Sequence, residues 1–219
     1  MSPVIRNHNG FIDKYIGDAV MALFPQTADD AVQAAIEMQK QVSLYNSYRQ
    51  ENGYDPIAIG IGLHSGTLML GTVGESQRME TTVIADAVNL ASRLEGLTKV
   101  YGVDILISDQ TLYRLDNREK YSCRFLDRVK VKGKSQPVEV FEVYDANPPR
   151  LIELKRQTCD EFEQGVALYV EKNFAQAQQV FQQVLQRNEQ DRVTQLYIER
   201  CEKARKFGVS EVNYQAIAH

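Results

Sequence analysis

Short apolar runs alternate with helix-like segments over the first 145 residues, and this alternation constrains the fold more than any other feature of the sequence. The segment FIDKYIGDAVMALF has two such runs around Gly17-Asp18, a pair that is typical of a tight turn between strands. Simple alternation along the first run places Lys14 with Ile12 on one strand face and Asp13 on the other.

Further apolar runs are typical of strands at residues 57–63, 67–73, 103–108, 124–134 and 138–144. We expect the first two to form a hairpin that turns at Ser65-Gly66, and the last two to pair with each other. Helical periodicity marks residues 27–53 and 86–102, and a shorter helix is predicted at 109–115. Strands and helices thus alternate without strict βαβ regularity, which predicts an α+β domain with a central sheet covered by helices.

The composition changes at Asn147-Pro148-Pro149, a pattern that is typical of a linker. Beyond it the chain is polar, and helices are predicted at residues 154–171, 174–187 and 191–206. The spacing of one tetratricopeptide unit is found in four residues, Gly165, Phe174, Ala177 and Phe181. We therefore divide the chain into a mixed domain at 1–146, a linker at 147–153, tetratricopeptide-like helices at 154–208 and a tail at 209–219. A lone repeat buries its apolar face poorly, so these helices are expected to pack on the mixed domain or on a protein partner.

Charge and cysteine content exclude several classes of protein. The formal net charge of -4 and the pI of about 5.5 argue against a general nucleic-acid-binding function. The three cysteines (Cys123, Cys159 and Cys201) are scattered and form neither a disulfide framework nor a CxxC metal pair. No apolar run approaches the roughly 20 residues that cross a bilayer. These features predict a soluble protein of the cytoplasm.

Polar residues at defined spacings are candidates for a binding or catalytic site. Asp18, at the predicted hairpin tip, would present a carboxylate to a hard cation, although a Gly-Asp pair also serves simply as a turn. Asn89 and Arg93 lie four residues apart on a predicted helix and so project from one face, either toward a ligand or toward solvent.

Lysines form the second group of candidates. Lys14 lies on an otherwise apolar strand face, so its charge needs either a partner or a path to water. Lys132 and Lys134 flank Gly133, where they would bind phosphate or form a solvated basic strand end.

Three segments resemble a known enzyme family, and they occur in the family's order over residues 1–145. NGFIDKYIGDAVMALF is similar to the metal-binding hairpin of class III adenylate and guanylate cyclases. TTVIADAVNLASRL resembles the later strand-to-helix segment, and RVKVKGKSQPVEVFEV the closing strand pair. The resemblance implies a ferredoxin-like core with a mainly antiparallel central sheet, and the helices that follow it resemble a tail found on some bacterial members.

The resemblance also implies a reaction and a role for each candidate. The family converts ATP to cyclic AMP and pyrophosphate by attack of the ribose 3′ oxygen on the α-phosphate. By this likeness Asp18 binds metal, Arg93 stabilises charge on the α-phosphate and Asn89 orients the ribose. Lys132 is the lysine expected to meet the β- and γ-phosphates.

Purine choice in the family depends on a residue pair that corresponds to Lys14 and Thr82. A lysine donates to N1 of adenine, and a threonine hydroxyl can accept from the exocyclic amine. Many adenylate cyclases carry Asp where Thr82 stands, so the Lys/Thr pair resembles a bacterial subgroup of adenylate cyclases. The resemblance therefore implies ATP as the substrate.

One feature of the family has no counterpart in this sequence. The family holds two divalent cations, Mg²⁺ or Mn²⁺, with two aspartates, and the first of these precedes Asp18 on an opening strand that the sequence does not contain. Two functions therefore remain open. The chain is an adenylate cyclase whose site forms at the interface of a homodimer or of a dimer with a complete protomer, or it is a catalytically incomplete, cyclase-like interaction subunit.

Overall fold

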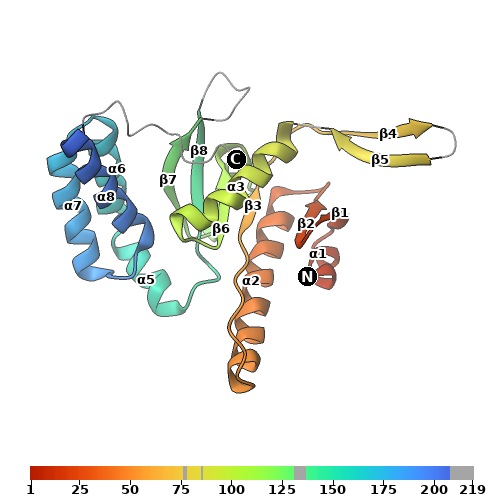
Figure 1. The fold of residues 1–219 in the computed structure, drawn as a ribbon, viewed down its shortest axis with the longest axis horizontal. Coiled ribbons are helices and arrows are strands. Elements are labelled where there is room, and N and C mark those ends of the chain that lie inside the picture. Colours follow the sequence, from red (N-terminus) through yellow and green to blue (C-terminus); the bar gives the residue numbers. More distant parts are fainter. Residues whose placement is uncertain (76–77, 85, 131–136, 208–219) are drawn as a thin grey trace.

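The computed structural model describes residues 1–75, 78–84, 86–130 and 137–207, with residues 69–84 described by their backbone alone. Figure 1 shows a central sheet with helices on either side, a two-stranded arm that projects from one end and a group of helices at the other. The fold is of the α+β class, as predicted. None of the helices in the described ranges is both long and apolar enough to cross a membrane.

The chain begins with a short helix and a hairpin. Helix α1 (Ser2–Asn7) leads into strands β1 (Phe11–Ile16) and β2 (Ala19–Leu23), which pair in antiparallel fashion. Gly17 adopts a φ of +63°, a left-handed conformation that favours glycine, and so allows the tight turn. The hairpin predicted around Gly17-Asp18 is confirmed.

Helix α2 (Ala28–Glu51) follows the hairpin and confirms the long helix predicted at 27–53. Thr27 and Asp30 form a capping box, in which each side chain accepts a hydrogen bond from the other residue's backbone amide. The helix ends at Asn52, whose backbone amide donates to carbonyl groups of the last turn. The buried face of α2 includes Val32 and Ala35.

The central sheet has four strands in the order β3-β6-β8-β7: β3 (Ile61–Leu63), β6 (Ile105–Ser108), β8 (Val138–Val143) and β7 (Cys123–Val129). Strands β3 and β6 are parallel, and the other two pairs are antiparallel. The sheet is therefore mainly antiparallel, and the predicted pairing of the last two strands is confirmed.

The hairpin predicted around Ser65-Gly66 is wrong. Strand β3 pairs with β6 instead, and β4 (Met69–Glu75) pairs with β5 (Arg78–Ile84) in the projecting arm. Tertiary packing outweighed the local turn propensity of Ser65-Gly66 in choosing the partner of β3. Ile61 in β3 packs against the apolar cluster that contains Ile105 and Ile107. Two adjacent runs separated by a good turn dipeptide were therefore not partners.

Helices cover both faces of the sheet. Helix α3 (Asp86–Tyr101) lies on one face, and α2 with α4 (Asp109–Leu112) lies on the other, while a 3-10 turn (Arg118–Lys120) precedes β7. The side chains of β6 alternate accordingly, because Leu106 joins the cluster on the α3 side whereas Ile105 and Ile107 join the cluster with Val32. Helix α3 confirms the helix predicted at 86–102.

Four helices form the C-terminal group: α5 (Pro149–Gln157), α6 (Cys159–Val170), α7 (Phe174–Arg187) and α8 (Arg192–Phe207). Helix α5 begins within the range expected to be a linker, and the helix predicted at 154–171 is divided at Thr158. The Thr158 hydroxyl donates to the carbonyl oxygen of Leu154 at 2.8 Å, so the side chain competes with the continuing helix.

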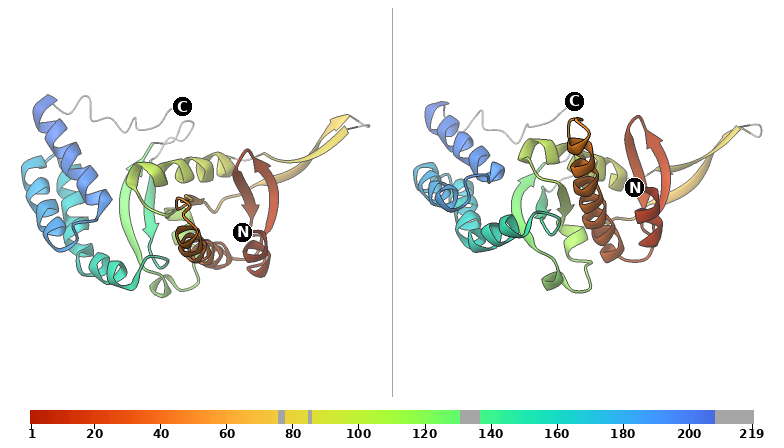
Figure 2. Two further views of the ribbon diagram at one scale, coloured as in Figure 1. Left: turned by 60° about the horizontal axis from the view of Figure 1, so that its bottom comes forward. Right: turned by 90° about the horizontal axis from the view of Figure 1, so that it is seen from below.

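The C-terminal helices share one apolar core with the sheet. Phe162, Phe181 and Tyr197 belong to the same buried cluster as Leu94 of α3 and Leu126 of β7. Figure 2 shows these helices against the β7 side of the sheet. Their assignment to the tetratricopeptide family stays a prediction, as does the division of the chain into domains.

Gly62 sets the distance between β3 and α3, which gives a testable prediction. A Cβ atom at Gly62 would overlap with the backbone of Ala91 and Glu95 in α3. Gly62→Ala is expected to lower the free energy of unfolding by about 1–3 kcal/mol, as overpacking does. Gly96→Ala is a matched control, because a Cβ there meets nothing within 4 Å and should instead stabilise α3 by about 0.5–1 kcal/mol. Denaturant unfolding of both variants measures this difference, and equal midpoints would contradict it.

Candidate active site

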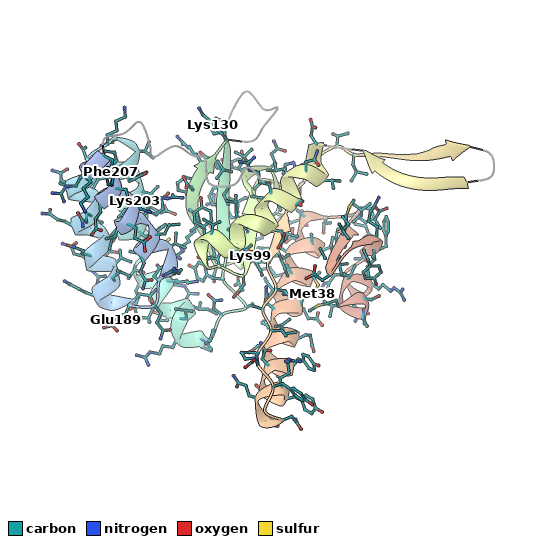
Figure 3. All side chains as sticks on the ribbon, viewed as in Figure 1. Met38, Lys99, Lys130, Glu189, Lys203 and Phe207 are labelled. Atoms are coloured by element: carbon teal, nitrogen blue, oxygen red, sulfur yellow. The ribbon has the colours of Figure 1, made fainter. Side chains whose placement is uncertain are left out.

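The predicted site residues fall on the hairpin, on the projecting arm and on helix α3. Lys14 lies in β1, Asp18 at the turn between β1 and β2, Thr82 in β5, and Asn89 and Arg93 on α3. Only the backbone of Thr82 is described, and it pairs with Gly71 across the arm. Lys132 lies outside the described residues. Figure 3 labels Lys130, which follows β7 and is the last described residue before Lys132.

Asp18 stands exposed at the tip of the hairpin. The left-handed Gly17 before it is also exposed, and a Cβ atom added there would meet nothing within 4 Å. A single exposed carboxylate has the right chemistry for a hard cation. Within the described residues, however, no group of three or more His, Cys, Asp and Glu side chains gathers to hold a metal ion.

Helix α3 orients Asn89 and Arg93 through its apolar neighbours. Leu90 and Leu94 are fully buried against the sheet, which leaves Asn89 exposed on the other face and Arg93 partly buried at its edge. The Nε atom of Arg93 is buried and has no hydrogen-bond partner within the described part of the protein. An unpaired buried donor costs free energy. Arg93 as a residue is only partly buried, so its side chain is a candidate for binding an anionic ligand.

Lys14 has an acidic neighbour that the sequence pattern did not place beside it. Its Nζ atom lies 3.3 Å from Oδ2 of Asp13. The pairing of β1 with β2 shifts register between Ile12 and Lys14, so a bulge falls at Asp13. The expectation that Asp13 and Lys14 occupy opposite strand faces is therefore wrong, because a bulge interrupts the alternation of side chains.

Within the described residues, the site residues of the hairpin and those of α3 are not joined by a hydrogen bond or an ion pair. The hairpin forms a sheet of its own, separate from the four-stranded sheet. Among the described residues no hydrogen bond or ion pair links Lys14 or Asp18 to Asn89 or Arg93. The hairpin also carries exposed apolar side chains, namely those of Phe11, Tyr15, Ile16 and Val20.

A family model described as the adenylate and guanylate cyclase catalytic domain matches residues 4–144, which include every predicted site residue. The chain belongs to the adenylate and guanylate cyclase family. Its hairpin, α3 and the β7–β8 pair are thus the segments that the cyclase resemblance identified from sequence.

Individual cyclases agree with this assignment. An adenylate cyclase from Anabaena cylindrica is 48% identical over 149 residues, covering 65% of this chain and 30% of the relative. A terminal-differentiation-specific adenylate cyclase from Dictyostelium discoideum is 36% identical over 207 residues, covering 91% of this chain and 10% of the relative. The adenylyl cyclase CyaB from P. aeruginosa has a similar structure, with a TM-score of 0.54 and 31% identity over 65% of this chain and 75% of that one.

The chain spans less than a third of the length of the relatives from Anabaena cylindrica and Dictyostelium discoideum. Cyclase domains of this class use divalent metal ions, bind ATP and typically act as dimers. Asp18 fits one part of such a metal site. The described residues do not form the rest of it, because no group of three or more His, Cys, Asp and Glu side chains that could hold a metal occurs among them.

Proposed function

We propose that this chain is the catalytic part of an adenylate cyclase that forms cyclic AMP and pyrophosphate from ATP. The observation that carries the proposal is the buried, unpaired Nε of Arg93, on the helix face that also presents Asn89. A guanidinium with a free donor is suited to the phosphoryl oxygens of a triphosphate, because its donors form a rigid fork. The relatives named as adenylate cyclases support the choice of reaction.

Each residue has a proposed task in this reaction. Arg93 donates to the oxygens of the α-phosphate as charge develops there during attack by the ribose 3′ oxygen. Asn89, one helical turn earlier and exposed, orients the ribose. Lys14 donates to N1 of adenine and Thr82 accepts from the exocyclic amine. Lys132 neutralises the β- and γ-phosphates, which leave as pyrophosphate.

Two divalent cations, Mg²⁺ or Mn²⁺, would supply further neutralisation of the phosphates when bound. Asp18 is the residue of this chain that would hold them, because its carboxylate is exposed at the hairpin tip. One carboxylate does not offset the charge of two nearby cations. A second carboxylate is therefore required, and we assign no step of the reaction to the ions.

We also propose that the site is completed by a second protomer, either another copy or a complete cyclase protomer. The separation of Asp18 from Asn89 and Arg93 favours this arrangement, since the metal aspartates of one protomer would face the purine-reading residues, Asn89 and Arg93 of the other across an interface. The hairpin offers an apolar surface for it, because Tyr15 is 68% and Ile16 is 59% exposed. Exposed aromatic and aliphatic side chains at this density are typical of interface cores.

A non-catalytic interaction subunit remains the alternative, and the absence of a metal-binding group in the described residues favours it. In that case the C-terminal helices would engage a further protein. Cyclic AMP formation by the cyclase dimer decides between the two functions. Formation of cyclic AMP that depends on Arg93 establishes the enzyme, and no formation with any complementing protomer establishes the interaction subunit.

Nucleotide choice tests the proposed function directly. Changing Lys14→Glu together with Thr82→Cys is expected to lower the ratio of ATP to GTP use by about 10- to 100-fold, because hydrogen bonds to a charged group are lost. Lys40→Glu on the exposed face of α2 makes the same charge change away from the site and should leave the ratio unaltered. Rates of cyclic AMP and cyclic GMP formation measure this ratio. Equal use of ATP and GTP by the wild type would contradict the assignment of Lys14 and Thr82 to adenine recognition.

A further inference from the structure

The pair formed by Asp13 and Lys14 is unusual for two adjacent residues of a strand. Neighbouring side chains of a regular strand point to opposite faces and do not form ion pairs with each other. Here the bulge in β1 brings the Lys14 ammonium to 3.3 Å from the Asp13 carboxylate. Bulges of this kind often redirect a side chain beside an active site.

The two partners differ in their access to solvent. The Asp13 side chain is only 8% exposed, whereas the Lys14 side chain is 37% exposed. Oδ2 of Asp13 is buried and has no hydrogen-bond partner within the described residues, so its one close polar neighbour of opposite charge is Lys14. Burying a carboxylate oxygen without a hydrogen bond costs free energy, and other interactions of the fold offset this cost.

We infer that Asp13 is a positioning residue that sets the nucleotide specificity of the site by holding the Lys14 ammonium toward the purine. This inference rests on the proposed function, in which Lys14 reads adenine. Asp13 itself does not touch the base, because its Oδ2 atom is enclosed by protein. It acts through Lys14.

The geometry leaves Lys14 able to bind a ligand while it is held. An ammonium group has three donors, and a separation of 3.3 Å is longer than the 2.7–2.9 Å of a tight charge-assisted hydrogen bond. Donors therefore remain for N1 of adenine. The Asp13 carboxylate also offsets the positive charge of Lys14 locally. This weakens the attraction of Lys14 to the triphosphate and favours its hydrogen bond to the uncharged base.

The test measures the affinities for ATP and GTP by displacement of a fluorescent ATP analogue from the full chain together with the protomer that completes its site. Asp13→Asn keeps the shape of the side chain but removes its charge. We expect the ratio of ATP to GTP affinity to fall by about tenfold, the size of one lost hydrogen bond to a charged group. Asp13→Glu, which keeps the charge, should retain part of the preference. Asp116→Asn makes the same charge change on an exposed loop and should leave the ratio as in the wild type.

A double-mutant cycle with Lys14→Ala separates positioning from a general structural effect. Asp13→Asn should not alter the ratio further once Lys14 is alanine, since Asp13 acts only through the ammonium. A further change in that background would overturn the inference. Retention of the wild-type ratio by Asp13→Asn, when Lys14→Ala lowers it, would overturn the inference and leave the proposed function intact. An unchanged ratio in both single variants, or undetectable binding of both nucleotides, would overturn the inference together with the purine reading on which it rests.

Discussion

Arg93→Ala is expected to lower the turnover number of the proposed cyclase dimer by on the order of 100-fold or more, while the affinity for ATP changes much less. The reason lies in where Arg93 sits on α3. Its Nε is buried without a partner within the described residues, so this donor is already desolvated before ATP arrives. A donor prepared in this way stabilises the charge that develops in the transition state more than it stabilises the ground state.

The measurement is the rate of cyclic AMP formation from ATP with Mn²⁺ or Mg²⁺, at saturating and at low ATP. Lys99→Ala is the matched control, because Lys99 is an exposed cation on the same helix and its loss should leave the turnover number unaltered. Figure 3 labels Lys99 on α3. Arg93→Lys keeps the charge without the rigid fork and should fall between the two. An unaltered turnover number in Arg93→Ala would mean that this face of α3 has no catalytic task.

Local sequence patterns predicted the individual helices and strands well. Thr27 followed by Asp30 marks the start of α2, and the Gly17-Asp18 turn gives the β1–β2 hairpin. These features depend on contacts a few residues apart, which a sequence displays directly. The pairing of β3 with β6 could not be predicted in the same way. Helix α3 lies between these two strands in the sequence, and the pairing depends on its packing over Gly62 of β3.

The same division between local and tertiary signals applies to the candidate site. The spacing of Asn89 and Arg93 placed them on one face of a helix, and the structure agrees with that spacing. The proximity of Asp13 to Lys14 was missed, because a one-residue bulge reverses the face on which a side chain lies. Its one signal in the sequence is the adjacent acid and base in the otherwise apolar run FIDKYI.

A buried ionic network between the sheet and the C-terminal helices was not predicted from the sequence. Arg124 of β7 is 1% exposed and donates from Nε to Glu142 of β8 at 2.6 Å. Its two other nitrogens bind the carboxylate of Asp191, just before α8, at 2.6 and 2.9 Å. Lys155 of α5 also binds Glu142, so two cations and two carboxylates are buried together.

The ring of Phe162 in α6 completes the contacts of Arg124, whose guanidinium carbon lies 4.7 Å from the ring centroid. Burial alone would disfavour the charged form of Asp191, but the charge of Arg124 and its hydrogen bonds lower the pKa of Asp191 below the usual value. A lowered folded-state pKa means that this group stabilises the fold above its unfolded-state pKa near 3.8 and that the contribution is lost as pH falls further.

Arg124→Met is therefore expected to destabilise the protein by about 3–5 kcal/mol, because among the described residues it leaves the two buried carboxylates with Lys155 as their remaining ion-pair partner. Denaturant unfolding at pH 7 measures the loss. Arg128→Met is the matched control on the same strand, since the Arg128 side chain is 54% exposed and its ion pair with Glu139 is accessible to water. Its loss should cost about 0–1 kcal/mol. Equal costs for the two variants would contradict the proposed importance of the buried network.

A double variant shows why the single loss of Arg124 should be so large. In Arg124→Met with Asp191→Asn, the carboxylate that Arg124 held in bidentate fashion is no longer charged, so part of the stability should return. The coupling energy in this cycle isolates the bond between the sheet and α8 from the apolar packing of Phe162 and Tyr197. A coupling energy near zero would mean that apolar packing alone holds the C-terminal helices on β7. A large one would mean that these helices are fixed to the strand leading toward Lys132 by charge as well as by burial.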